Sequence, residues 1–226
     1  MADPARDWSL PGLADIAPQL PAHCVVTDGG STKSDVVALM REHLSGQLAQ
    51  CVPAHPIAGS DLSGAVAAQY GLYDNRRIVV TPLPETAAAA AALVRELWQA
   101  CGARVYEMSA AEHDAVFATV SHLPHLLAFA YVDMIVAKQD GERCFDFAAT
   151  GFRDFTRIAG SHPEMWRDIA LANRDALLAE LDGYRAALDS LRDELASGDA
   201  AALTARFERA REARHGWHQK FLRGNS

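Results

Sequence analysis

The sequence predicts an α/β portion followed by an all-α portion, and two observations lead to this fold class. Before about residue 102, short apolar runs alternate with helical segments, which is the β-α-β rhythm of a parallel α/β sheet. From residue 109 onward the β-branched runs disappear, and helix-forming residues dominate up to the C-terminus. We therefore expect two domains, one at 1–108 with a parallel sheet and one at 109–226 made of helices.

The α/β portion is expected to contain four strands and two helices. The expected strands are the apolar runs 23–28, 50–60, 76–82 and 104–108, and the expected helices are 34–44 and 86–101. Gly29 and Gly30 form a turn before the first helix. Thr32 and Asp35, three residues apart, have the pattern of a capping box, so a well-capped helix start is one interpretation of this stretch.

The second portion is expected to contain three long helical stretches. Residues 110–137 form an apolar helix in which Pro124 is a point of bending. Residues 165–198 form a helix that ends at Gly198, and 199–221 form a last amphipathic helix. Helices this long in a small domain usually bury their apolar stripes against a second subunit. We therefore expect a homodimer.

Composition and charge argue against several classes of partner. The 226 residues carry a formal net charge of -8, which disfavours a nucleic-acid or anionic-membrane surface. The longest apolar run, 126–137, contains Asp133 and is too short to cross a bilayer, and the N-terminus lacks the pattern of a secretory signal. The four cysteines form no C-x-x-C pair. We expect a soluble cytoplasmic protein with free thiols.

Polar residues in four places could carry chemistry. His55 follows a short apolar run and leads into a glycine-rich turn, where a histidine is well placed for acid–base work or serves as an ordinary loop or core residue. His122 and His125 lie three apart on an apolar helix and therefore share a face. They suit a ligand pocket, a hydrogen-bonded core or, less well, a metal, because His113 lies nine residues away on roughly the opposite face.

The other two places suggest anion binding. Arg153 and Arg157 are four apart, so two guanidinium groups on one helix face could clamp a carboxylate or phosphate, or form surface ion pairs. Ser31 and Lys33 lie at a helix N-terminus, which favours negative charge.

Five motifs, taken in order, give these residues a common context. TDGGSTK, HPIAGSDLSG, EHDAVFATVSHLPHLLAFA, GFRDFTRIA and MWRDIALANR resemble the prephenate dehydrogenase family, which includes arogenate and cyclohexadienyl dehydrogenases. The resemblance runs from about Leu13 to Arg214. It implies a partial Rossmann-like parallel sheet followed by a helical dimerisation domain. It also implies oxidative decarboxylation of prephenate or arogenate with NAD or NADP, on the route to tyrosine.

The resemblance also implies a role for each residue. His55 would take the proton of the substrate's ring hydroxyl, Ser31 would hydrogen-bond in the same network, and Arg157 would bind a substrate carboxylate. The remaining site residues implied by the family are Arg153, His122, His125 and Ser60 for the substrate, and Gly30 and Lys33 on the nicotinamide side of the cofactor.

The sequence departs from the family pattern in its N-terminal part. The family begins with a strand, a G-x-G-x-x-G turn and a helix, and the 226 residues contain no such turn. Two expectations fit this pattern. One is a dehydrogenase whose chain is truncated, and inactive alone for that reason, or is completed by another polypeptide. The other is a non-catalytic dimer that keeps the carboxylate pocket as a ligand-binding or regulatory module. A metal hydrolase that uses His122 and His125 is a third interpretation. We expect these residues alone not to bind NAD or NADP tightly.

Overall fold

The computed structural model describes residues 11–58 and 68–224, and its contacts divide the chain after Leu177 into two compact units. The first unit contains the sheet and the shorter helices. The second unit contains the C-terminal part of one long helix and the whole of the next. The domain division after residue 108 lies within the first unit, and it remains a prediction.

A three-stranded sheet with the order β1-β2-β3 is the centre of the α/β part. Its strands are β1 (Ala54–Ile57), β2 (Arg77–Val80) and β3 (Arg104–Glu107). β2 and β3 are parallel, as expected, whereas β1 runs antiparallel to β2 with His55 opposite Val79. The sheet is therefore mixed, and the described part of the connection before β2, residues 68–76, forms turns at 70–75. The expected strand at 23–28 contributes one parallel bridge, from Val26 to Cys51.

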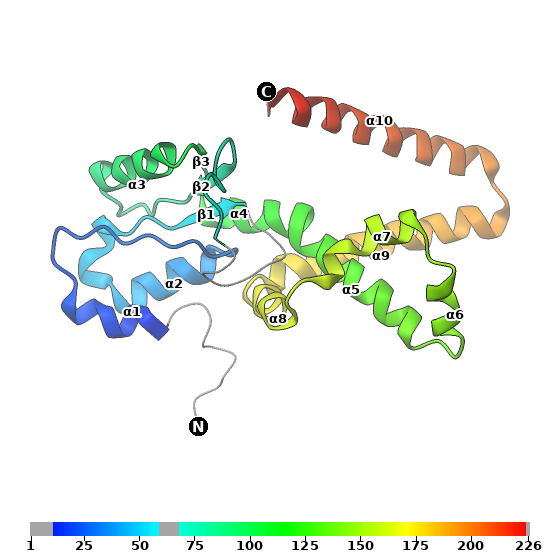
Figure 1. Ribbon diagram of the computed structural model, residues 1–226, viewed down its shortest axis with the longest axis horizontal. Coiled ribbons are helices and arrows are strands. Elements are labelled where there is room, and N and C mark those ends of the chain that lie inside the picture. The colour runs from blue at the N-terminus through cyan, green and yellow to red at the C-terminus, as the bar shows by residue number, and fades with distance from the viewer. Residues whose placement is uncertain (1–10, 59–67, 225–226) are drawn as a thin grey trace. The chain divides into compact units, whose positions relative to one another are not determined.

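Helices cover the sheet on both sides, as Figure 1 shows for α3 above the strands and for α1 and α2 below them. α1 (Pro11–Ile16) and α2 (Ser34–His43) enclose one buried cluster that includes Met40. α3 (Ala88–Ala100) packs on a second cluster that includes Ile78 and Val80 of β2. The two expected helices of this part are confirmed within two residues at each end, while α1 was not predicted.

One continuous helical segment links the sheet to the helical part of the first unit. It consists of α4 (Ala110–Phe117), a π-turn (Ala118–His122) and α5 (Leu123–Val136). The irregular turn therefore lies just before Pro124, where a bend was expected. By length and composition alone these 27 residues could cross a membrane, unlike the shorter run 126–137. Core helices of soluble proteins pass the same test, and this segment carries the buried polar side chains of His113 and Asp114.

Three short helices, α6 (Gly141–Asp146), α7 (Thr150–Thr156) and α8 (Pro163–Ala172), follow α5. The helix expected at 165–198 is broken at Asn173, whose φ of -106° and ψ of 30° separate α8 from α9 (Arg174–Ser197). The prediction of one unbroken helix is therefore wrong. The Asn173 side chain forms hydrogen bonds with the neighbouring α4–α5 segment instead. Gly198, with φ of 68°, ends α9 where expected.

The second unit contains the C-terminal part of α9 and α10 (Ala200–Gly224), which confirms the expected last helix. Arg206 joins the two helices, because its Nε donates to Glu194 Oε2 at 2.9 Å. Apolar side chains nevertheless remain outside this hairpin, with Leu195 69% and Phe207 57% exposed. The pair presents apolar surface that its own residues do not cover.

Candidate functional site

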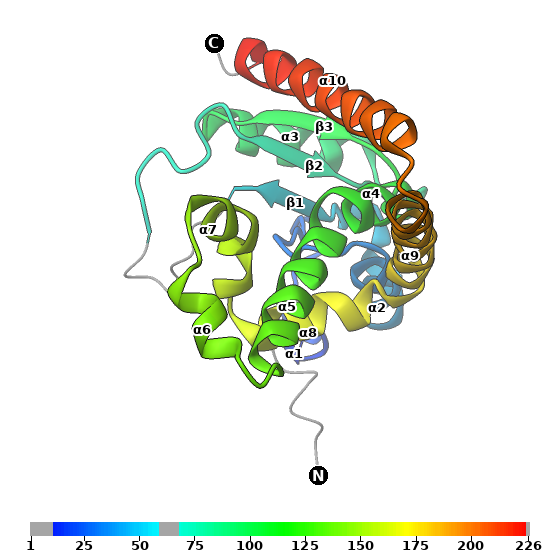
Figure 2. The same cartoon turned by 90° about the vertical axis from the view of Figure 1, so that its right-hand side faces the viewer.

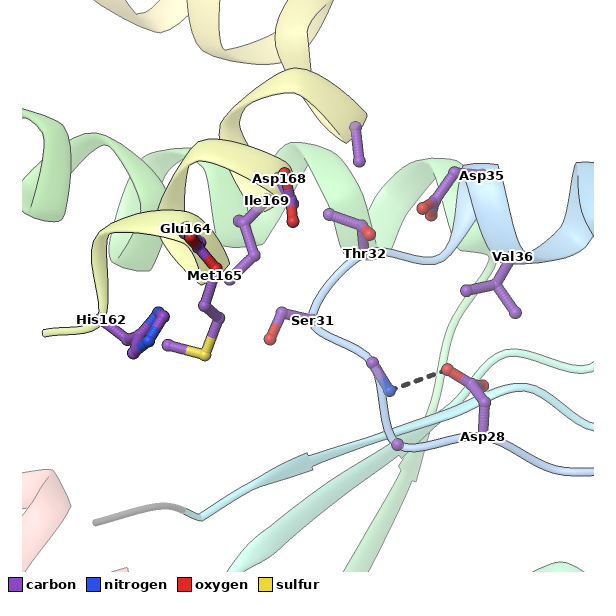
Figure 3. A pocket seen from close by; sticks show the side chains of 13 residues that line it. Asp28, Ser31, Thr32, Asp35, Val36, His162, Glu164, Met165, Asp168 and Ile169 are labelled. Atoms are coloured by element: carbon purple, nitrogen blue, oxygen red, sulfur yellow. Dashed lines mark hydrogen bonds between the residues drawn. The ribbon is translucent and has the colours of Figure 1, made fainter. Parts of the chain in front are cut away.

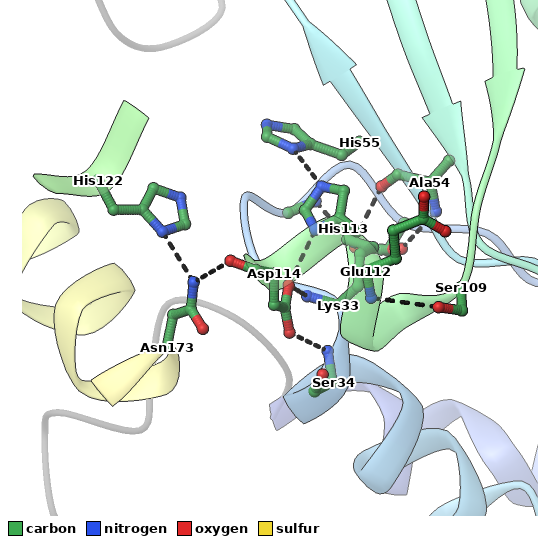
Figure 4. A network of polar contacts seen from close by, with 12 residues as sticks. Lys33, Ser34, Ala54, His55, Ser109, Glu112, His113, Asp114, His122 and Asn173 are labelled. Atoms are coloured by element: carbon green, nitrogen blue, oxygen red, sulfur yellow. Dashed lines mark hydrogen bonds and ion pairs between the residues drawn. The ribbon is translucent and has the colours of Figure 1, made fainter. Parts of the chain in front are cut away.

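Three histidines from different elements of the first unit form the centre of the site (Figure 4). His55 comes from β1, within the strand and not after it, while His113 comes from α4 and His122 from the π-turn. His55 Nδ1 lies 2.8 Å from His113 Nε2, and His113 Nδ1 lies 2.8 Å from Asp114 Oδ1. A continuous row of polar contacts therefore runs from the Asp114 carboxylate to His55.

The π-turn explains why His113 and His122 both face inward. In a regular α-helix, nine residues place two side chains on opposite faces, which was the expectation for this pair. A π-turn accommodates one extra residue, about 100° of helix phase, between them. His113 is 0% and His122 is 1% exposed. The expectation of opposite faces is thus wrong.

Asp114 caps α2 from a distant part of the chain. Its Oδ1 accepts a hydrogen bond from the main-chain N–H of Lys33 at 2.8 Å, and its Oδ2 accepts one from Ser34 at 2.7 Å. No side-chain capping bond from the α2 sequence itself is present at this helix start. The capping box predicted for Thr32 and Asp35 is therefore wrong, since the carboxylate of α4 already satisfies the main-chain N–H groups.

Lys33 is fully buried, and both partners of its side chain belong to the protein itself. Its ammonium forms an ion pair with Asp28 and donates to the main-chain oxygen of Ala54 at 2.9 Å. Asp28 in turn accepts hydrogen bonds from the main-chain N–H groups of Gly30, at 2.8 Å, and Ala54, at 2.9 Å. This pair ties the turn at residues 28–32 to strand β1, on which His55 lies.

Burial keeps His55 and His122 neutral. Loss of solvent, reinforced by the neighbouring His113 and the ammonium of Lys33, lowers the pKa of His55 to about 3. Loss of solvent likewise lowers the pKa of His122 to about 4, although Asp114 and the main chain of Ser31 act in the opposite direction. For Asp114, burial raises the pKa, but hydrogen bonds from His113, Ser34 and Lys33 outweigh it and bring the pKa to about 2. At neutral pH the carboxylate is charged and both imidazoles are not.

Asn173 determines which nitrogen of His122 carries hydrogen. The Asn173 amide nitrogen donates to the main-chain oxygen of Asp114 at 2.8 Å, and it lies 3.1 Å from His122 Nδ1. Because this nitrogen is a donor, Nδ1 of the neutral ring accepts and Nε2 carries the hydrogen. Nε2 is buried and has no hydrogen-bond partner of normal geometry among the described residues. A buried donor without a hydrogen-bond partner of normal geometry suits an anionic or carbonyl ligand.

His125 and Arg157 extend the site beyond His122. His125 donates from Nδ1 to the main-chain oxygen of Ser121 at 2.9 Å and stacks on Trp166, with ring centroids 3.5 Å apart. Trp166 also meets the His122 ring edge to face at 6.1 Å, so the shared face predicted for the two histidines is confirmed. Burial lowers the pKa of His125, and the positive charge of Arg157 lowers it further.

The remaining predicted residues lie differently. α7 ends at Thr156, and Arg157, its C-cap residue with φ of -47° and ψ of -42°, begins a 3-10 turn. The shared helix face expected for the two arginines stays a prediction. Arg153 has a side chain that is 71% exposed and pairs with Asp154 at 2.9 Å. Ser60 lies outside the described residues.

A cavity of about 540 Å³ lies beside the turn at residues 28–32 (Figure 3). Ser31 and Gly30 contribute to one wall, and Met165 and Ile169 of α8 contribute to another together with His162, the N-cap residue of that helix. Its carboxylates are Asp28, Asp35, Glu164 and Asp168. Lys33, His55 and His122 do not line it, although the main chain of Ser31 acts on the His122 ring. Ser31 therefore connects the wall of the cavity with His122.

Three residues of the site were not identified as functional from the sequence: His113, Asp114 and Asn173. His113 and Asp114 lie in the residues EHD at 112–114, inside one of the five motifs, but neither was assigned a role from the sequence. No group of three metal-binding side chains is found within 11–58 and 68–224. Nothing in the local sequence shows that Asn173 breaks a helix, because its partners lie 51 and 59 residues away.

Two family models match the chain in succession. The model of the prephenate dehydrogenase nucleotide-binding domain matches residues 5–107. The model of the prephenate dehydrogenase dimerization domain matches residues 109–209.

Individual relatives agree with these matches. The chain is 36% identical over 213 residues to a cyclohexadienyl dehydrogenase of Zymomonas mobilis, covering 93% of this chain and 72% of the relative. It is 38% identical to a prephenate dehydrogenase of Bacillus subtilis, covering 85% of this chain but only 52% of the relative. Among solved structures, a prephenate dehydrogenase of A. aeolicus with hydroxyphenyl propionate and NAD+ has a TM-score of 0.85 at 33% identity, covering 90% of this chain and 71% of that one.

Proposed function

Because this chain belongs to the prephenate dehydrogenase family, we propose that its first unit forms the substrate-binding and proton-accepting part of an NAD(P)-dependent prephenate or arogenate dehydrogenase. The observation that carries the proposal is the neutral His55 held in a row of buried polar groups. A neutral imidazole can take a proton, whereas a charged one cannot.

His55 is the group assigned to the ring hydroxyl. In oxidative decarboxylation of prephenate, hydride leaves the ring carbon that bears the hydroxyl, the hydroxyl proton is removed, and carbon dioxide is lost as the ring becomes aromatic. His55 accepts that proton, and Ser31 hydrogen-bonds beside it. The nicotinamide, when bound, accepts the hydride. The chain itself must orient the substrate and bind its two carboxylates.

His122, His125 and Arg157 are assigned to the carboxylates. His122 offers a buried N–H without a partner of normal geometry among the described residues. Arg157 is close enough to His125 for its charge to lower that pKa, so the positive group and the histidines act on the same region. A ligand carboxylate there would gain charge-assisted hydrogen bonds. Arg153 and Ser60 remain proposed for the same pocket, with Arg153 at its exposed rim.

The cavity beside Ser31 is assigned to the nicotinamide side of the cofactor. Its walls combine apolar side chains of Val36, Met165 and Ile169 with carboxylates, and the oxidised nicotinamide ring is flat and positively charged. Gly30 lines this cavity, whereas Lys33 is held by Asp28 and Ala54 and acts through the turn that it fixes. The cofactor is NAD or NADP. A cavity that holds the nicotinamide ring suits both, because the ring is the same in the two molecules.

A homodimer is the proposed assembly. The model of the family's dimerization domain covers residues 109–209, and the α9–α10 hairpin exposes apolar side chains such as Leu195 and Phe207. Apolar surface of this kind is typical of obligate dimer interfaces. We place the enzyme in the cytoplasm, where no nucleic acid or membrane is needed as a partner.

Binding of a substrate analogue tests the proposal without requiring a nicotinamide. 4-Hydroxyphenylpropionate carries the ring, hydroxyl and carboxylate of the product, and calorimetry of the full 226-residue chain is expected to show binding. His122→Phe keeps a ring beside Trp166 but removes the buried N–H, so the analogue should bind about 10 to 100 times more weakly. His43→Gln, outside the site, is the control. No measurable binding, or equal binding by His122→Phe, would overturn the proposal.

A further inference from the structure

We infer that His113 and Asp114 are positioning residues that fix the proton of His55 on Nδ1 and leave Nε2 as the atom that accepts a proton. The inference rests on the proposed function only in assigning a substrate hydroxyl to Nε2. The arrangement of hydrogens in the row follows from the contacts themselves, and it can be measured separately.

The row begins at an acceptor that cannot donate. Both oxygens of Asp114 accept main-chain N–H groups, Oδ1 from Lys33 and Oδ2 from Ser34, at 2.8 and 2.7 Å. These bonds favour the ionised carboxylate, which has no hydrogen of its own. His113 Nδ1, 2.8 Å from Oδ1, must therefore carry the hydrogen and donate it.

The next contact follows from the first. A neutral imidazole carries one N–H, so a His113 that donates from Nδ1 has only a lone pair on Nε2. His113 is 0% exposed, and its Nδ1 is taken up by the contact with Asp114 Oδ1. His113 Nε2 therefore accepts, and His55 Nδ1, 2.8 Å away, donates. The lone pair of a neutral His55 is then on Nε2.

This arrangement also prepares His55 to hold a proton. When Nε2 takes one, the ring becomes a cation whose Nδ1–H already points to His113, and the ionised Asp114 lies one ring further on (Figure 4). A carboxylate behind an imidazole stabilises positive charge on it and holds its tautomer, which is the usual function of an orienting group behind a general base. Phe117 packs on both rings, with centroids 4.9 Å from His55 and 4.4 Å from His113, and restricts their movement.

Imidazole nitrogen NMR of the ¹⁵N-labelled full chain tests the tautomer directly. His55, assigned by loss of its signals in His55→Gln, should be protonated on Nδ1 and unprotonated on Nε2. In His113→Phe, which keeps a ring but removes the acceptor, His55 should revert to the Nε2–H form that predominates for histidine in water. Phe117→Leu alters the same ring cluster without touching a nitrogen, and should keep the Nδ1–H form. A wild-type His55 protonated on Nε2 would overturn the inference, even where His113→Phe fails to fold.

A pair of ligands separates this role from a purely structural one. Wild-type protein should bind 4-hydroxyphenylpropionate about 3 to 10 times more tightly than 3-phenylpropionate, because the phenol donates to His55 Nε2. His113→Phe should lose that preference but still bind 3-phenylpropionate, whereas Phe117→Leu should keep it. An unchanged preference in His113→Phe would overturn the inference. Failure of both ligands to bind would instead refute the proposed function, while the NMR result would stand independently.

Discussion

Replacing Lys33 with methionine should destabilise the first unit more than any surface substitution, because it leaves a buried carboxylate without its cation. Lys33 is 0% exposed, and its ammonium contacts Asp28 and the main-chain oxygen of Ala54. Removing one partner of a buried pair typically costs about 3–5 kcal/mol. Asp28 keeps two main-chain N–H donors and its side chain is 14% exposed, so we expect the lower end, about 3 kcal/mol.

A double-mutant cycle shows whether the pair itself is responsible. Lys33→Met leaves the charge of Asp28 without a partner, and Asp28→Asn removes that charge. The double variant should therefore be about 2 kcal/mol more stable than the sum of the single losses predicts. Urea unfolding followed by tryptophan fluorescence, to which Trp98 and Trp166 of the first unit contribute, measures each variant. Lys138→Met, at an exposed position, is the control and should change stability by less than about 0.5 kcal/mol. A loss below about 1 kcal/mol for Lys33→Met, or an additive cycle, would refute the reasoning.

Four further outcomes are expected. The folded pKa values of His55 and His122, about 3 and 4, lie below the usual 6.5, so the unfolded chain binds more protons in acid. The contribution of each neutral histidine to the free energy of unfolding should be complete above pH 6.5 and should fall towards pH 4 by at most about 1.4 kcal/mol per pH unit. Glutamine variants of the two histidines should flatten that slope in urea titrations. Arg157→Ala should weaken binding of 4-hydroxyphenylpropionate by about 2–4 kcal/mol in calorimetry, and Arg153→Ala should weaken it less because Arg153 is exposed; equal losses would contradict this order. Light scattering at micromolar concentration should give a dimer mass, and a monomer mass would count against the proposed assembly. Calorimetry should find that NAD binds these 226 residues more weakly than the low micromolar range, since they contain no G-x-G-x-x-G turn, and steady reduction of NAD with prephenate would show the opposite.

The sequence predicted the elements whose signals are local. The apolar runs that became β2 and β3, the alanine-rich α3 and the glycine that ends α9 all follow from residues near one another in the chain. The antiparallel pairing of β1 and the break at Asn173 depend instead on contacts between distant residues. Periodicity carries no information about such contacts, and it therefore predicted a purely parallel sheet and one unbroken helix.

The site was predictable in its residue types more than in its connections. The five motifs suggested His55, His122, His125 and Arg157, and the structure brings His55 close to His122 and His125 close to Arg157. The π-turn that rotates His113 into this group has no clear sequence signature, because a single extra residue per turn leaves composition unchanged. Once the rotation is known, the residues EHD at 112–114 have a clear place in the site, since His113 and Asp114 face the same buried centre.

Asp114 connects the stability of the fold to the chemistry of the site. The same carboxylate caps α2 through Lys33 and Ser34 and orients His113. An asparagine there would have one acceptor atom where the structure uses two, so either the helix start or the imidazole would lose its partner. Loss of activity in an Asp114 variant would therefore leave the cause ambiguous. His113→Phe separates the two effects, because it leaves both capping bonds in place and removes only the contacts of the imidazole with Asp114 and His55.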